Sequence, residues 1–127
     1  MSITIRVPAV LPSLNSQKRM HWAEYARLRK AWAWHIIADV GQPIIRFPYP
    51  FARITFTRHA SRLLDADNLA GAFKPVLDVL RPMTKTNPNG LGFIEDDDAS
   101  HVVVTYQQAK CPAKLAHTTI HIEAWAA

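Results

Sequence analysis

Cysteine is nearly absent from the 127-residue chain, which contains only Cys111. A single thiol cannot form an intrachain disulfide, so the sequence excludes a disulfide-framed secreted domain and fits a reducing compartment. Long apolar runs are also absent, since no stretch approaches the ~20 residues that cross a membrane, and the first residues lack the layout of a signal peptide. We therefore expect a soluble, cytoplasmic protein with one domain, residues 1–127, and no membrane partner.

Acidic residues are scarce in the first half of the chain. Residues 1–64 contain ten Lys and Arg but only two Asp and Glu, a local net charge of +8. Residues 65–98 contain three Lys and Arg and seven Asp and Glu, a local net charge of −4. Acids gathered so closely repel one another. A bound cation would neutralise them, and the basic remainder would attract a polyanion such as nucleic acid.

Several familiar site motifs are missing as well. The chain has no glycine-rich phosphate loop, no Cys-x-x-Cys pair and no His-Glu-x-x-His sequence. A calcium EF-hand loop that began at Asp65 would place Leu69, Ala70 and Val76 at positions where that loop needs other residues. These absences leave the acidic clusters as the feature that indicates chemistry.

Apolar periodicity predicts a small α/β (α+β) domain with a mixed sheet of about four strands and two main helices. The second helix should begin near Asp67 and reach Leu80, and Pro75 predicts a kink or a short first turn within it. The first helix is predicted at 17–39, the strands at 3–7, 51–58, 101–107 and 117–125, loops at 13–17 and 82–92, and a proline-rich connector at 41–50.

The second predicted helix has a polar stripe along one side. The positions that share this side are Asp67, Gly71, Lys74 and Asp78. The apolar stripe begins at Leu69, about 200° away, so the polar side chains are predicted to point away from the core. Gly71 would leave a gap through which a bulky ligand could approach. A solvated face with a Lys74–Asp78 ion pair is the structural alternative.

Two acidic clusters form the candidate site. Asp65 and Asp67 open the second helix, where a carboxylate can also serve simply as a helix cap. Residues 95–98 are Glu-Asp-Asp-Asp, which nothing structural requires. If the two loops lie side by side, both aspartates and an acid of this run would bind Mg²⁺, which could activate water at a phosphate. Lys74 could pair with a phosphate oxygen or stabilise the leaving group.

Four segments combine into one ordered pattern. They are Pro12–Asn15 (PSLN), Asp65–Leu69 (DADNL), Lys74–Leu80 (KPVLDVL) and Gly92–Asp97 (GFIEDD). This pattern resembles the RusA family of Holliday junction resolvases. The likeness touches most of the chain, and the part from Asp-x-Asp-Asn-Leu to Asp-Asp is specific. The resemblance implies a RusA-like endonuclease domain.

The resemblance also implies the roles of individual acids. It identifies Asp65 and Asp67 as catalytic, metal-binding acids and matches Asp97 to the third acid of the family pattern. Matching backward from Ala99 would select Asp98 instead, because the acidic run has one acid more than the pattern needs. Asp97 and Asp98 therefore both stand as candidate metal ligands.

The family's functional lysine corresponds to Lys74 if three residues within 70–73 are an insertion. Three residues are nearly one helical turn, so the face of the helix would be roughly kept. The resemblance further implies a homodimer that nicks paired strands of four-way DNA junctions with Mg²⁺, for which Mn²⁺ could substitute, and with no small-molecule cofactor. The expected phosphate contacts are Lys18, Arg19, Arg27, Arg29, Lys30, Arg53, Arg58 and Arg62.

Alternatives of other classes remain open. A non-catalytic DNA-binding protein could keep the RusA-like fold while its acids only cap a helix and decorate a loop. A phosphohydrolase for small nucleotides would need a closed pocket with few basic residues, which the basic first half disfavours. Trp22, Trp32 and Trp34 are candidates for the core or a dimer interface, although an exposed one could stack on a base at an opened junction.

Overall fold

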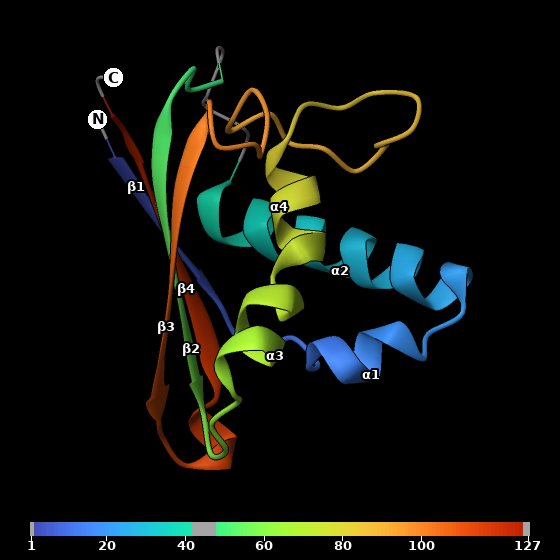
Figure 1. The fold of residues 1–127 in the computed structure, drawn as a ribbon, viewed down its shortest axis with the longest axis vertical. Coiled ribbons are helices and arrows are strands. Elements are labelled where there is room, and N and C mark those ends of the chain that lie inside the picture. The colour runs from blue at the N-terminus through green and yellow to red at the C-terminus, as the bar shows by residue number, and fades with distance from the viewer. Residues whose placement is uncertain (1, 42–47, 126–127) are drawn as a thin grey trace.

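The structure is a single sheet with helices packed over one of its faces (Figure 1). The computed structural model describes residues 2–41 and 48–125. The strands are β1 (Ser2–Val7), β2 (Ala52–Ala60), β3 (Val102–Lys110) and β4 (His117–Ala124). The helices are α1 (Leu14–Lys18), α2 (Trp22–Val40), α3 (Ala66–Ala72) and α4 (Lys74–Leu80), and a 3₁₀ turn, η1 (Ala113–Leu115), precedes β4. No helix among these is long and apolar enough to cross a membrane.

The strands lie in the order β1-β4-β2-β3, with β2 and β3 parallel and β4 antiparallel to both β1 and β2. The predicted α+β class and the mixed sheet of four strands are confirmed. A parallel pair of strands needs a long crossover, which α3, α4 and the loop after them provide between β2 and β3. This crossover contains every acid of the predicted site.

The core lies between the sheet and the helices. Ile54 and Phe56 of β2 and Ile120 of β4 are fully buried, because alternate residues of a strand point to the same face. Phe73, at the junction of α3 and α4, stacks on Phe56 with ring centroids 4.4 Å apart. Burying one such side chain stabilises the fold by about 1.5–3 kcal/mol, so this stack fixes the α3–α4 junction against the sheet.

The first half of the chain differs locally from its prediction. The expected loop at 13–17 is mostly α1, because the hydroxyl of Ser13 accepts a hydrogen bond from the backbone N–H of Ser16 and caps a short helix. The expected helix at 17–39 is α2, which begins only at Trp22, where the His21 ring caps it. Residues 42–47 of the predicted connector lie outside the described residues.

The second helix is divided in two, at the place where Pro75 predicted a kink or a short first turn. α3 ends at Ala72, Phe73 caps it, and α4 begins at Lys74 with Pro75 in its first turn. Proline fits the first turn of a helix because its missing N–H would have no partner there. The division changes the direction of the chain, so residues before and after Phe73 do not share one continuous helical stripe.

Candidate active site

Asp65 and Asp67 lie at the start of α3. Asp65 is the N-cap, and its carboxylate accepts hydrogen bonds of 2.9 Å from the backbone N–H and from the side-chain amide of Asn68. These hydrogen bonds lower the pKa of Asp65 below its ordinary value. Asp67 is exposed in the first turn. The helix-cap alternative therefore describes what Asp65 does here, while Asp67 has its carboxylate open to solvent.

Side chains of β2 and β3 hold the loop that leads to Asp65. The Arg58 guanidinium donates to the carbonyl oxygen of Arg62 at 2.7 Å. The Gln108 amide accepts from the backbone N–H of Leu64 at 2.9 Å and donates to the carbonyl oxygen of the same residue at 2.6 Å. Arg58, which the sequence analysis expected to contact phosphate, is only 9% exposed. Its side chain instead holds the loop that positions the two aspartates.

α1 packs directly on α3. The side chain of Leu14 occupies the space beside Gly71, where an added Cβ would lie 2.5 Å from the Leu14 Cδ2. The backbone N–H of Asn15 donates to the Asn68 side chain at 3.1 Å, which ties the PSLN segment to the DADNL segment. The predicted gap for a ligand at Gly71 is thus filled by α1. Gly71 is small because two helices approach each other closely there.

Lys74 meets the acidic run at Asp97. The Lys74 Nζ donates to Asp97 Oδ2 at 2.7 Å and lies 3.5 Å from Asp78 Oδ1. The hydrogen bond to Asp97 raises the pKa of Lys74. Burial raises the pKa of the Asp97 carboxyl, but the bond to Lys74 and its charge outweigh burial and lower it. This pair joins α4 to the acidic run, whereas the sequence-based expectation concerned the Asp65–Asp67 loop and that run.

Asp78 is buried, contrary to its predicted place on a solvated stripe. Three cations surround its carboxylate: Lys74, Arg29 of α2 at 3.8 Å and Arg81 at 3.6 Å. Arg81 also lies 3.5 Å from Asp96. The prediction failed because the division of the helix turns α4 so that α2 covers this side of it. The result is a charge network that links α2, α4 and the acidic run.

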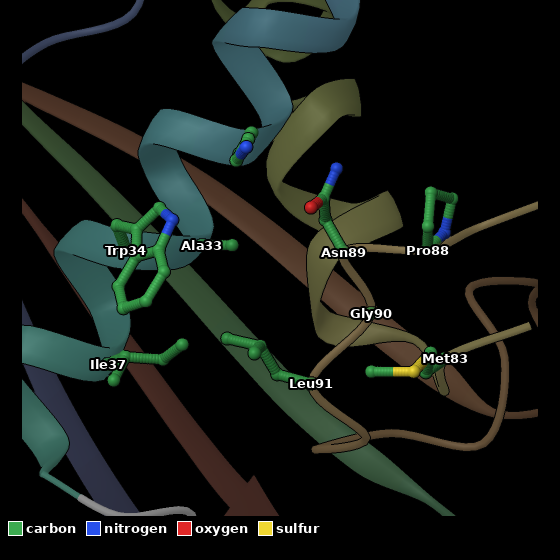
Figure 2. Close-up of a pocket in the computed structure, with 9 residues that line it drawn as sticks. Ala33, Trp34, Ile37, Met83, Pro88, Asn89, Gly90 and Leu91 are labelled. Atoms are coloured by element: carbon green, nitrogen blue, oxygen red, sulfur yellow. The ribbon is translucent and has the colours of Figure 1, made fainter.

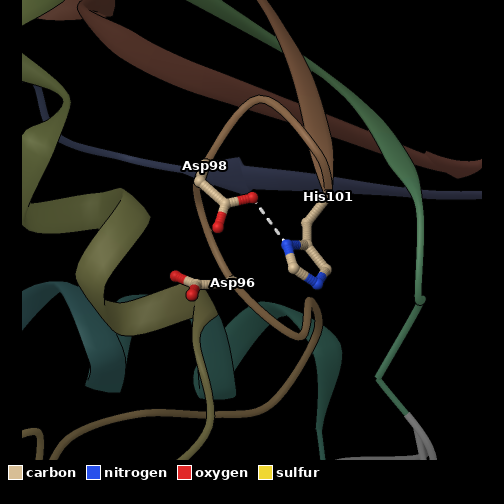
Figure 3. Close-up of side chains that lie close together, drawn as sticks. All are labelled: Asp96, Asp98 and His101. Carbon is tan, nitrogen blue, oxygen red and sulfur yellow. Dashed lines mark hydrogen bonds and ion pairs between the residues drawn. The ribbon is translucent and has the colours of Figure 1, made fainter.

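Asp98 points to another neighbour. Its Oδ1 lies 2.6 Å from Nδ1 of His101, which raises the pKa of His101 and lowers that of Asp98 (Figure 3). Asp96, Asp98 and His101 each offer a ligand atom, and these atoms lie within 4.8 Å of one another. Sequence reasoning missed His101, although its i,i+3 spacing from Asp98 was a signal. Among the residues that the structure describes, Asp96, Asp98 and His101 form the one group of three His, Cys, Asp or Glu side chains that meets this distance. The predicted ligand set of Asp65, Asp67 and Asp97 does not meet it.

The predicted acids suit Mg²⁺ by ligand type, but two of their carboxylates are already hydrogen-bonded within the chain. Carboxylate oxygens are the ligands that Mg²⁺ prefers, and Asp65, Asp67 and Asp97 supply them from one crossover. The Asp65 carboxylate is occupied by Asn68 and that of Asp97 by Lys74. These acids fit the ion by type, and to share it they would exchange hydrogen bonds within the chain for bonds to the metal.

The charge of Lys74 acts on two tyrosines, Tyr25 and Tyr106, that sequence reasoning did not select. Tyr106 of β3 packs against Phe73, with ring centroids 5.9 Å apart. Burial raises the pKa of Tyr106. The charge of Asp97 also raises this pKa, while the charge of Lys74 lowers it. Burial likewise raises the pKa of Tyr25 of α2, and the charge of Asp78 raises it further. Both phenols therefore remain protonated near neutral pH and can donate hydrogen bonds.

The remaining predicted phosphate contacts differ in exposure. Arg29 is half-buried against Asp78, and its guanidinium also lies over the Tyr25 ring, 5.1 Å from the centroid. Arg53 is exposed, 3.9 Å from Glu123 and over the ring of Trp125. The other exposed members of the set are Lys18, Arg19, Arg27, Lys30 and Arg62. These five can reach a DNA backbone without breaking an ion pair of the network around Asp78.

Comparison with known proteins adds no relative. No protein-family model matches this chain, and no curated protein matches it. The site is therefore defined by its own residues: an aspartate pair at the start of α3, and a lysine that joins α4 to an acidic run.

Proposed function

We propose that this protein is a Mg²⁺-dependent, structure-selective endodeoxyribonuclease that resolves four-way DNA junctions by paired nicks and acts as a homodimer. The contact between Lys74 and Asp97 is the observation that carries the proposal. It joins two of the residues that the family resemblance assigned to catalysis, from separate elements, into one charged centre. The exposed cations of α1 and α2 supply the affinity for a polyanion that such an enzyme needs.

The roles follow from exposure and partners. Asp65, Asp67 and Asp97 are the residues assigned to hold the ion, which when bound would provide a Lewis acid at the scissile phosphate. The side chain of Lys74 is about half-exposed, and it can donate to a phosphate oxygen while Asp78 and Asp97 hold it in place. The buried partner fixes the lysine, so the cation is already positioned before DNA arrives.

Cleavage of a synthetic four-way junction and of its matched linear duplex tests the proposal. The reactions contain Mg²⁺ or EDTA and use the wild type, Asp67→Asn and Asp39→Asn. Asp39 is the matched control, because it is an exposed aspartate on α2 whose carboxylate accepts from the backbone N–H of Arg6, which an asparagine can still do. We expect Mg²⁺-dependent symmetric nicks in the junction alone, lost in Asp67→Asn and retained in Asp39→Asn.

A non-catalytic DNA-binding protein is the second candidate. The hydrogen bonds from Asn68 to Asp65 and from Lys74 to Asp97 favour it, because they satisfy these acids without an ion. Junction binding by the wild type with no cleavage in Mg²⁺ or Mn²⁺, under conditions where another junction resolvase cuts, would support this candidate and reject the nuclease.

A further inference from the structure

A pocket of about 190 Å³ opens between α2 and the loop that follows α4 (Figure 2). Figure 2 shows Ala33, Trp34 and Ile37 of α2 on one side and the loop on the other. Lys30, Trp34, Met83, Asn89 and Leu91 are among the residues that line it. The pocket is separate from the Lys74–Asp97 centre, since it shares no lining residue with that centre.

The loop wall of the pocket is held in place by hydrogen bonds. The side chain of Asn87 is buried and donates to the carbonyl oxygens of Asp78 at 2.7 Å and Pro82 at 3.2 Å. The backbone N–H of Leu91 donates to the carbonyl oxygen of Val79 at 2.8 Å. The pocket is thus largely formed before any ligand binds, which lowers the entropic cost of binding.

The chemistry of the lining is apolar with a polar rim. Trp34 is 63% exposed and Met83 is 71% exposed, so the pocket presents an indole and a thioether to solvent. Asn89 adds an amide that can both donate and accept. A flat apolar surface next to one polar side chain is suited to a planar heteroaromatic ring with hydrogen-bonding edges.

Positive charge surrounds the same pocket. Lys30 lies in its wall, and Arg27 is exposed on the same side of α2, since residues 27, 30 and 34 follow the i, i+3, i+7 spacing of one helical face. Cations that alternate with an exposed aromatic ring are the pattern by which proteins hold unpaired nucleotides: the cations contact phosphate and the ring stacks on a base.

We propose that this pocket receives an unstacked nucleobase at the branch point of DNA, with Trp34 stacked on the base and Lys30 on an adjoining phosphate. The inference rests on the proposed function, because a four-way junction is the substrate that offers such a base. Stacking on an aromatic side chain is tolerant of base identity. The pocket would therefore add selectivity for branched DNA over linear duplex without a preference for one sequence.

A second copy of the chain is a poorer occupant of this surface. A two-fold contact places the same patch on both partners, so Arg27 and Lys30 would face the equivalent cations of the other copy. Like charges brought together in this way oppose association. A nucleic acid strand instead brings phosphates to these cations and a flat ring to Trp34.

Binding without cleavage tests the inference. A fixed four-way junction carries 2-aminopurine beside the branch point, a second carries it in the middle of one arm, and a linear duplex serves as the reference, all in EDTA. The variants are Trp34→Ala, Trp34→Phe and Trp22→Ala. Trp22 is the matched control because it is 76% exposed on the same helix but does not line the pocket. Circular dichroism and size-exclusion chromatography check the fold and the oligomeric state of each variant.

We expect Trp34→Ala to weaken junction binding roughly tenfold or more, as measured for lost base stacking elsewhere, and to leave duplex binding unchanged. The fluorescence change of the branch-point label should be lost with it, while Trp34→Phe retains most of both effects and Trp22→Ala retains all.

Equal junction binding and an equal fluorescence change in Trp34→Ala would overturn the inference, as would an equal loss on junction and duplex. A change of oligomeric state in Trp34→Ala would assign the pocket to self-association instead. A wild type that binds junction no better than duplex would reject the proposed function itself.

Discussion

The Lys74 Nζ lies 2.7 Å from Oδ2 of Asp97 and 3.5 Å from Oδ1 of Asp78. One cation thus joins an acid of its own helix to an acid of the loop that precedes β3. The pKa of Lys74 is raised first by the hydrogen bond to Asp97, and that of Asp97 is lowered by the same bond against the opposing effect of burial. Both shifts mean that the charged forms are favoured in the folded protein.

The variant Lys74→Met should raise the pKa of the Asp97 carboxyl. The folded pKa of Asp97 is depressed, so its stabilising contribution is present above the unfolded value of about 4 and is lost as the pH falls through the folded value. The raised pKa of Lys74 gives a contribution that is present below about 10.5 and is lost as the pH rises through the folded value. The stability difference between wild type and Lys74→Met should therefore be largest between these limits.

Carboxyl carbon chemical shifts in a pH titration measure the Asp97 pKa directly, and urea unfolding across the pH range measures the stability difference. Lys85→Met is the control, because Lys85 is exposed in the loop after α4. An Asp97 pKa that is the same in Lys74→Met and in wild type would contradict the assignment of this bond.

Asp78→Asn should destabilise the fold. The substitution removes the negative charge that faces Lys74, Arg29 and Arg81, and it leaves these cations close together. Breaking a fully buried ion pair costs about 3–5 kcal/mol. The three cations are partly exposed to solvent, so we expect a loss of about 1–3 kcal/mol in the free energy of unfolding. Urea unfolding measures it, and a loss no larger than that of Asp39→Asn would show that the network does not stabilise the fold.

Gly71→Ala should also destabilise the protein, although alanine is the better helix former by about 1 kcal/mol. The new Cβ would lie 2.5–2.9 Å from three carbons of the Leu14 side chain, so α1 would have to shift. Overpacking of this kind costs about 1–3 kcal/mol. In a double-mutant cycle, Leu14→Ala should remove most of the penalty of Gly71→Ala. Strict additivity of the two substitutions would contradict the close contact between α1 and α3.

The strands and the breaks in the helices were predictable because they are local. Alternating apolar residues identify a strand without its neighbours, and Pro75 and the Asp65 cap act within a single turn. The environments of Asp78 and Gly71 were not predictable in this way, because Arg29 and Leu14, which cover them, come from helices far away in the sequence. A helical projection separates polar from apolar sides, but it cannot show that a second helix lies over the polar one.

The same reasoning applies to the acidic run. The sequence raised the question whether it lies beside the Asp65–Asp67 loop, and the contact that the structure shows is with Lys74 of α4. The three aspartates of the run have different partners, since Asp97 faces Lys74, Asp96 faces Arg81 and Asp98 faces His101, which Glu95 also approaches. Consecutive residues in a turning loop point in different directions, so no pattern of like residues could assign these partners.

His101 should titrate above its ordinary pKa of about 6.5, because the hydrogen bond to Asp98 favours the imidazolium. A raised folded pKa gives a stabilising contribution that is present below the unfolded value and is lost as the pH rises through the folded value. In Asp98→Asn the pKa of His101 should fall. Imidazole proton chemical shifts measure both values, and His35, which lies on α2, is the internal reference in the same spectra. An unchanged His101 pKa in Asp98→Asn would refute the pairing.

Arg58 and Arg27 should affect DNA binding in different ways, because one is buried under the Asp65 loop and the other is exposed on α2. Arg27→Ala should weaken binding to all DNA and reduce the slope of log K against log salt by about 1, as expected for one lost phosphate contact. Arg58→Met should leave this slope unchanged, because its guanidinium donates to the carbonyl oxygen of Arg62 and its side chain is largely buried.

The effect of Arg58→Met should instead appear in the loop. Without the bond to Arg62 the loop before α3 opens more often, so the backbone amide of Leu64 should exchange with solvent faster than in wild type, and cleavage should fall as Asp65 and Asp67 lose their fixed position. Hydrogen exchange and the salt dependence of binding together separate the two roles. A reduced salt slope in Arg58→Met, with unchanged exchange at Leu64, would restore Arg58 as a phosphate contact and require that its side chain leave the core on binding DNA.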